Sequence, residues 1–159
     1  MATLGPTATP HPIVIELDTY LQKVVAFQWF EGHLDEQFES LELGQFDTDA
    51  SERWNTDFRT LLDEKVALID DWSAISPPDL FQEFHEWETE RLEIESDVRD
   101  LYASWLSIPG LSAWTEPPYD AYFVLLDRQF DFSIYSNESW AVGLEAYEEF
   151  GGDFAFLEE

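Results

Sequence analysis

Apolar residues recur every three or four positions through most of the chain, which is the repeat of amphipathic helices. The first such segment ends at Gly44 and carries Ile13, Leu17, Tyr20, Val24, Phe27, Leu34, Phe38 and Leu41. The second ends at Ser76-Pro77-Pro78 and carries Trp54, Phe58, Leu61, Leu68, Trp72 and Ile75. The third begins near Asp79, ends at Pro109-Gly110 and carries Leu80, Phe84, Trp87, Ile94, Val98, Leu101, Trp105 and Ile108. Proline and glycine at these ends stop a helix, so the pattern predicts three separate helices.

A fourth segment ends at Gly151-Gly152 and has apolar positions at Tyr119, Phe123, Leu126, Phe130, Trp140, Leu144 and Tyr147. Residues 130–135 alternate like a strand and Asn137 can cap a helix, so a break near residues 130–137 stays open. Short connections favour antiparallel neighbours, and the sequence therefore predicts an all-α, up-down antiparallel bundle of about four long amphipathic helices. We expect a flexible Thr/Pro-rich leader over residues 1–12, a single helical domain over 13–152 and an acidic-aromatic tail over 153–159.

One face of the third helix is predicted to be uniformly acidic. Its seven acids are spaced 4, 3, 4, 3, 4, 3, one residue out of step with the apolar positions: Asp79, Glu83, Glu86, Glu90, Glu93, Asp97 and Asp100. Like charges at these spacings cost about 0.2 to 0.5 kcal/mol per pair, so the row destabilises its helix by about 1 to 3 kcal/mol. Local stability does not account for such a row, and binding of a basic partner does. A second row is expected along one side of the fourth segment at Asp120, Asp127, Asp131, Glu138 and Glu145.

The composition is acidic throughout, yet it is that of a folded protein. The formal net charge is -28, from 35 Asp+Glu against 7 Lys+Arg in 159 residues, and this field excludes direct binding of nucleic acid. Hydrophobic residues make up 45% of the chain, with 13 Phe, 7 Trp and 6 Tyr, so a disordered acidic tail is also excluded. The absence of cysteine rules out disulfides, thiolate nucleophiles and cysteine metal sites.

Three charged residues occupy positions where an apolar residue is due, one in each of the first three helices: Glu31, Lys65 and Arg91. In an antiparallel bundle they fall in one layer, where they could form a buried cluster. The alternative is that one or more of them lie at the edge of the bundle, because successive positions of a 4,3 spacing rotate slowly around a helix. There the long side chains would reach solvent. Both alternatives assign these residues a structural role.

Catalysis has little support in the sequence. His33-x-x-Glu36 and His85-x-x-Glu88 could each offer two metal ligands, but their order is the reverse of the Glu-x-x-His of di-iron bundles, and surface histidines are favoured. No nucleotide-binding or hydrolase motif is present, so we expect a non-enzymatic protein without a cofactor.

No apolar run is long enough to span a membrane, and no signal peptide precedes Ile13. A cytoplasmic location is expected, with an extracytoplasmic one as the alternative if a signal has been removed before Met1.

In its composition and helical acidity, though in no motif, the chain resembles the acidic DNA-mimic proteins of phages and mobile elements. The resemblance implies an inhibitor that occupies the nucleic-acid-binding groove of a basic protein, such as a nuclease, a restriction or CRISPR effector, or a DNA-binding regulator. An immunity or antitoxin protein for a basic toxin would use the same interactions. The other alternative is a halophilic or exported helical domain whose acidity serves solubility.

Overall fold

The computed structural model describes residues 12–44, 51–106 and 117–157, which fold as four α-helices and two short 3₁₀ helices, with no strand among them. In chain order these are α1 (Pro12–Gly44), α2 (Ser51–Ser73), η1 (Asp79–Phe81), α3 (Gln82–Leu106), α4 (Pro117–Glu149) and η3 (Phe154–Leu157). The predicted all-α bundle is confirmed. The helix starts and ends agree with the proline and glycine signals: α1 begins at Pro12 and ends at Gly44.

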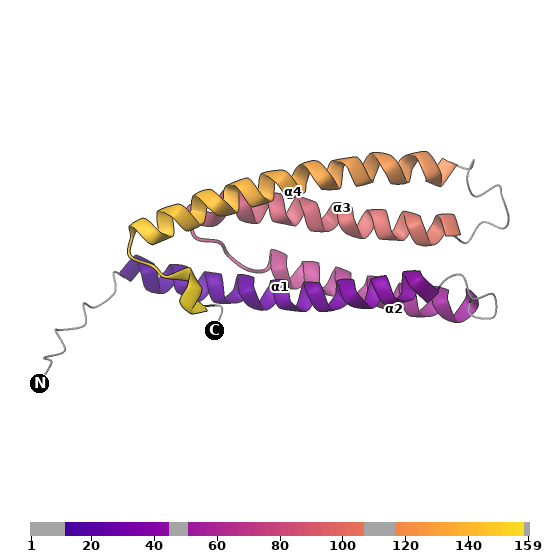
Figure 1. Cartoon of the computed structure of the whole chain (residues 1–159), viewed down its shortest axis with the longest axis horizontal. Coiled ribbons are helices and arrows are strands. Elements are labelled where there is room, and N and C mark those ends of the chain that lie inside the picture. Colours follow the sequence, from indigo (N-terminus) through magenta and orange to yellow (C-terminus); the bar gives the residue numbers. More distant parts are fainter. Residues whose placement is uncertain (1–11, 45–50, 107–116, 158–159) are drawn as a thin grey trace, which may run out of the picture.

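The helices run up and down along a common long axis (Figure 1). Helix α2 packs on α1 and on α3, and α3 packs along most of the length of α4. Helix α4 continues without interruption through residues 130–137, so the break considered from the sequence does not occur. Of the expected leader, only Pro12 lies within the described residues, where it is the first residue of α1.

Two apolar clusters fill the interior, one after the other along α1. The first gathers Val14, Leu17, Tyr20, Leu21, Val24, Phe27, Ile69, Trp72, Phe81, Phe84, Leu92 and Tyr147. The second gathers Leu34, Phe38, Phe58, Leu61, Leu62 and Ala103. Glu31 lies between Phe27 of the first cluster and Leu34 of the second. The interior therefore changes from apolar to charged and back to apolar along the bundle axis.

Small residues let α4 approach its neighbours closely. A Cβ atom added at Gly143 would lie 2.5 Å from Cε1 of Phe81, so the glycine makes room for the phenyl ring against the backbone of α4. Gly151 lies in the turn that follows α4, and its φ of 87° is a conformation that favours glycine. The chain then folds back (Figure 1), and Phe154 packs edge-on against Trp140 with ring centroids 5.4 Å apart. The described part of the tail is thus attached to the bundle.

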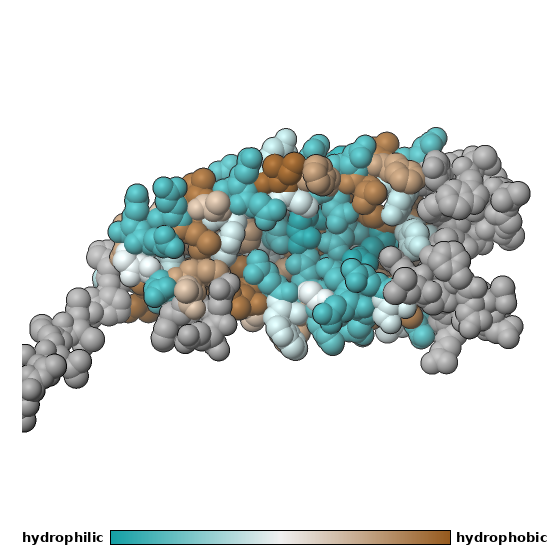
Figure 2. Space-filling model, in the orientation of Figure 1, coloured by the Kyte–Doolittle hydropathy of each residue, from teal (hydrophilic) through white to brown (hydrophobic). Residues whose placement is uncertain are grey.

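The apolar seam predicted for α4 is wrong over its first half. Phe123, Leu126 and Phe130 were expected in the core, but they are 43%, 38% and 67% exposed. In this half of α4, Tyr122, Leu125 and Gln129 are the less exposed residues, and Ser136 and Gly143 are buried farther along the helix. Figure 2 shows the result as apolar side chains interspersed with hydrophilic ones on the outer surface of α4. In the second half the prediction holds, because Trp140 and Leu144 pack on the first apolar cluster and Tyr147 lies within it.

None of the described helices contains a stretch that is long and apolar enough to cross a membrane.

Candidate functional site

The seven acids of the third helix form an exposed line, called here the α3 edge: Asp79, Glu83, Glu86, Glu90, Glu93, Asp97 and Asp100. Asp79 belongs to η1, and the other six belong to α3, which follows directly because Gln82 already has helical backbone angles. At a rise of 1.5 Å per residue the edge is about 32 Å long. All seven side chains are exposed, so the packing of α4 on α3 leaves the edge open to solvent.

Few of these carboxylates are neutralised by a neighbour. The Arg59 guanidinium of α2 lies 3.7 Å from Asp100, and both side chains are more than half exposed. Gln82 donates a hydrogen bond to Glu86 over 2.7 Å. Among the described residues no other ion pair involves the α3 edge. An exposed pair of this kind is weak and is screened by salt, so the edge keeps most of its charge available.

The five acids expected on the fourth segment also lie on one exposed side of α4, and we call them the α4 row: Asp120, Asp127, Asp131, Glu138 and Glu145. They point away from the side of α4 that carries the buried Ser136 and Gly143. Both predicted sets of partner-binding acids are therefore accessible, one on each of two neighbouring helices.

The structure brings Glu31, Lys65 and Arg91 together in the interior. The Lys65 ammonium lies 3.0 Å from Glu31, and the Arg91 guanidinium lies 2.6 Å from the same carboxylate oxygen. Lys65 is completely inaccessible to solvent, and Glu31 is 8% exposed. These side chains satisfy one another, which a buried charge requires.

Four further charged residues, which the sequence analysis did not assign to the interior, complete the cluster: Asp35, Glu88, Glu95 and Arg99. Glu95 is central, since it lies 3.0 Å from Lys65, 2.8 Å from Arg91 and 3.1 Å from Arg99. Ser136 of α4 donates a hydrogen bond to Glu88 over 2.6 Å. We call these seven charged residues the buried charge cluster, and through Ser136 it connects to all four helices.

The electrostatics of this cluster favour ionised groups. Burial alone would raise the pKa of Glu95, but Lys65, Arg91 and Arg99 hold it below its usual range. Burial also works against the charge on Arg91, yet its hydrogen bond with Glu88 and the charges of Glu88 and Glu31 raise its pKa overall. Asp35 differs, because burial and the nearby Glu95 raise its pKa despite Lys65 and Arg99.

A spacing signal for these missed residues is present in the sequence. Along α3, acid and base alternate at intervals of three, four and four residues: Glu88, Arg91, Glu95 and Arg99. Oppositely charged residues at these intervals lie on one side of a helix and pair with one another. The pattern marks a charged inner face opposite the α3 edge, and burial of its acids requires the partners that this alternation supplies.

The buried charge cluster changes the balance of charge on the rest of the molecule. It uses four of the 35 acids and three of the seven Lys and Arg residues, which leaves 31 acids and four cations elsewhere in the chain. The interior thus takes nearly half of the few cations, and the surface is more uniformly negative than the composition alone indicates.

The weak metal candidates are not brought together. His33 and Glu36 are exposed on α1 with 3.9 Å between Nδ1 and the carboxylate. His85 is buried against Tyr20, which lies about 20 Å from His33 along α1. Its ring stacks on Trp72 at 4.3 Å, while Glu88 binds Arg91 instead. The expectation that both histidines lie on the surface is therefore wrong for His85.

One other group of carboxylates has spacing that a metal could use. Oxygens of Glu31, Asp35 and Glu95 lie within 4.8 Å of one another. The Lys65 ammonium occupies this position, at 3.0 Å from Glu31 and Glu95 and 3.7 Å from Asp35. The lysine supplies the positive charge that a metal would otherwise provide, so these residues do not fit a metal site.

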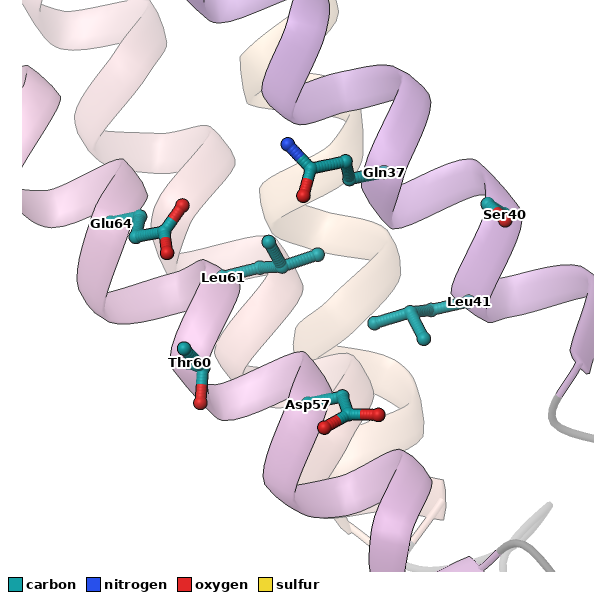
Figure 3. A pocket seen from close by; sticks show the side chains of 7 residues that line it. All are labelled: Gln37, Ser40, Leu41, Asp57, Thr60, Leu61 and Glu64. Carbon is teal, nitrogen blue, oxygen red and sulfur yellow. The ribbon is translucent and has the colours of Figure 1, made fainter.

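Two hollows of the described surface are lined by charged and polar side chains together with an apolar or aromatic one. One of about 400 Å³ lies between α1 and α2, where it is lined by Gln37, Ser40, Leu41, Asp57, Thr60, Leu61 and Glu64 (Figure 3). Another of about 440 Å³ lies beside the α3 edge and is lined by His85, Glu86, Trp87, Thr89, Glu90 and Glu93. The second combines three edge acids with an indole ring, which is a setting that suits a cationic side chain.

No protein-family model, curated protein or solved structure matches this chain.

Proposed function

We propose that this protein is a non-enzymatic inhibitor that occupies the nucleic-acid-binding groove of a basic protein. The observation that carries the proposal is the exposure of all seven acids of the α3 edge along one continuous helical segment. Their average spacing is about 5 Å along the helix axis, against about 3.4 Å per phosphate on one strand of B-DNA. The edge is thus a rigid line of negative charge of the kind that such grooves accept.

Carboxylates can replace phosphates because both accept charge-assisted hydrogen bonds from Arg and Lys. The hollow beside Glu86, Glu90 and Glu93 would admit an arginine whose guanidinium stacks on Trp87. The α4 row on the neighbouring helix adds a second line of charge, as the second strand of a duplex does. Association with a basic partner is expected to be fast and to weaken with salt.

The placement of cations inside the bundle also supports the proposal. Solubility alone does not require charges of one sign, because a surface with acidic and basic side chains interspersed is also soluble. In this chain Lys65, Arg91 and Arg99 are drawn into the buried charge cluster, while among the described residues only Arg59 pairs with the α3 edge. The result is an edge whose field has a single sign.

Affinity capture tests the proposal directly. Immobilised protein is incubated with lysate of the source organism at low salt, washed with increasing salt, and the eluted proteins are identified. We expect basic nucleic-acid-binding proteins to elute, and a variant carrying Glu83→Gln, Glu86→Gln, Glu90→Gln and Glu93→Gln to lose them. A matched control neutralises four exposed acids elsewhere, Glu16, Glu39, Asp63 and Asp70, and should retain them. Retention of only neutral or acidic proteins, or equal retention by both variants, would contradict the proposal.

The competing explanation of the acidity is adaptation to high salt. A halophilic protein unfolds when salt is withdrawn, whereas an inhibitor working in ordinary cytoplasm stays folded. Circular dichroism in low salt and in molar KCl separates the two. We expect the same helical spectrum in both solutions, since buried apolar clusters and satisfied ion pairs hold the bundle together.

A further inference from the structure

We propose that the outer surface of α4 binds a cationic amphipathic helix of the partner protein. The surface centres on an exposed apolar line, called here the α4 apolar stripe: Phe123, Leu126, Phe130 and Ile134. These side chains are 43%, 38%, 67% and 40% exposed. Their spacing of three, four and four residues places them on one side of the helix over about 17 Å. The inference rests in part on the proposed function, because it specifies what kind of basic segment the inhibitor recognises.

The stripe continues a line of side chains that is buried farther along the same helix. Trp140 and Leu144 pack on the first apolar cluster, and Phe154 of η3 covers Trp140. No described element covers Phe130 and Ile134 in the same way, as their exposed fractions show. An apolar line of this length on a soluble helix marks an interaction surface, whereas single exposed apolar residues do not.

The charge beside the stripe identifies the occupant. Asp127, Asp131 and Glu138 of the α4 row lie about 60° around the helix from the stripe, on its solvent-facing flank. A second copy of this chain would bring like charges together on that flank, which disfavours self-association. A helix with Leu, Ile or Phe on one side and Lys or Arg on the adjoining side matches both features.

The two features would contribute differently to binding. Carboxylates of the α4 row attract and orient the cationic side, and salt weakens this part. Burial of Phe130 and its neighbours does not depend on ionic attraction, so part of the affinity should persist at high salt. Large apolar side chains near the centre of an interface commonly dominate its affinity, which makes the α4 apolar stripe around Phe130 the expected anchor.

A synthetic peptide tests this inference without knowledge of the natural partner. The probe is a fluorescently labelled 18-residue peptide of Leu and Lys with Leu at every third or fourth position, and the reference is a scrambled peptide of the same composition. Fluorescence anisotropy gives the Kd of each at 50 and 500 mM KCl. We expect the amphipathic peptide to bind at least about tenfold more tightly than the scrambled one and to retain measurable binding at 500 mM.

Matched variants locate the site. Phe130→Gln with Ile134→Gln should weaken binding about tenfold or more at 500 mM KCl. A control with Ile15→Gln and Val66→Gln, at 55% and 48% exposed positions on α1 and α2, should stay within about twofold of the wild type. Circular dichroism checks that the helices persist, and Phe130→Gln alone gives the same comparison if the double variant loses helicity.

Three results would overturn the inference. They are equal binding of both peptides, no effect of the Phe130 and Ile134 changes, or dimerisation of the chain that these same changes abolish. The two proposals can fail separately. If the α3 edge variant loses lysate capture but the stripe variant still binds the peptide normally, only the α4 apolar stripe inference is contradicted. If the α3 edge variant keeps lysate capture and the stripe variant loses peptide binding, only the groove-occupying inhibitor is contradicted.

Discussion

Lys65 and Glu31 form an ion pair inside the bundle, with 3.0 Å between the ammonium nitrogen and a carboxylate oxygen and no solvent access to the lysine. The pair joins α2 to α1 at the point where the two apolar clusters meet. It fixes the register of these helices, because a shift of either by one turn would leave a buried charge without its partner.

Removing the lysine should be costly. Lys65→Met leaves Glu31 and Glu95 in the interior with less positive charge, and breaking a buried pair in this way typically costs about 3 to 5 kcal/mol of unfolding free energy. Urea denaturation followed by circular dichroism measures the change. Lys23→Met, which removes an exposed lysine from α1, is the control and should change the unfolding free energy by less than about 0.5 kcal/mol. Similar values for the two variants would contradict a structural role for the buried charge cluster.

His85 should contribute a loss of stability as the solution is acidified below neutral pH. Burial lowers the pKa of His85 despite the nearby carboxylates Glu88 and Glu86. Below the ordinary value of 6.5, the unfolded chain therefore takes up a proton that the folded chain does not, and this favours unfolding. Urea midpoints between pH 7.5 and 5.5 measure the effect.

His85→Gln tests the assignment, because it removes the titrating group. We expect its stability to depend less on pH than that of the wild type between pH 7.5 and 5.5. His33→Gln, at an exposed position, should keep the wild-type dependence. Below about pH 4.5 the lowered pKa of Glu95 means that protonation there favours the unfolded state in all three proteins, whereas the raised pKa of Asp35 acts in the opposite sense. A pH dependence unchanged by His85→Gln would show that another group is responsible.

The contact between Gly143 and Phe81 gives a third prediction. Gly143→Ala places a methyl group within 2.5 Å of the Phe81 ring, which is also packed against Tyr20 and Trp140, so the ring has little room to move. We expect a loss of about 1 to 3 kcal/mol in unfolding free energy.

Gly32→Ala is the matched control for that prediction, because nothing lies within 4 Å of the added atom and the position is inside α1. Alanine is the better helix former, so a gain of about 0.5 to 1 kcal/mol is expected there. Thermal or urea unfolding of the two variants should therefore shift in opposite directions. Destabilisation of both would mean that glycine is required for some reason other than the Phe81 contact.

Most of the fold could be predicted because helical periodicity is a local property of the sequence. Leu17, Val24 and Phe38 are buried where the spacing places them, and Gly44 ends α1 as expected. The apolar pattern of α4 misled for a physical reason. Apolar spacing identifies the side of a helix that is suited to burial, but it does not say what covers that side. Phe123 and Phe130 have this spacing and are not buried in the chain's own core.

The candidate surfaces were predictable to a similar degree. The α3 edge and the α4 row follow from spacing alone, and so does the layer that brings Glu31, Lys65 and Arg91 together. The burial of Glu88 and Glu95 depends on pairing with Lys65 and Arg91, and the Lys65 contact joins residues 30 positions apart in the sequence. The alternation of acid and base along α3 marks a paired side of that helix, but only tertiary packing brings Lys65 of α2 to it.

The most direct test of the central claim is a competition measurement with the basic protein recovered by affinity capture. Binding of a labelled duplex to that protein is measured by fluorescence anisotropy as this protein is added. We predict that the wild type displaces the duplex at low salt, and that a variant with Glu83, Glu86, Glu90 and Glu93 each changed to Lys remains folded and displaces none. Equal displacement by the two, or simultaneous binding of the duplex and the wild type, would contradict the account.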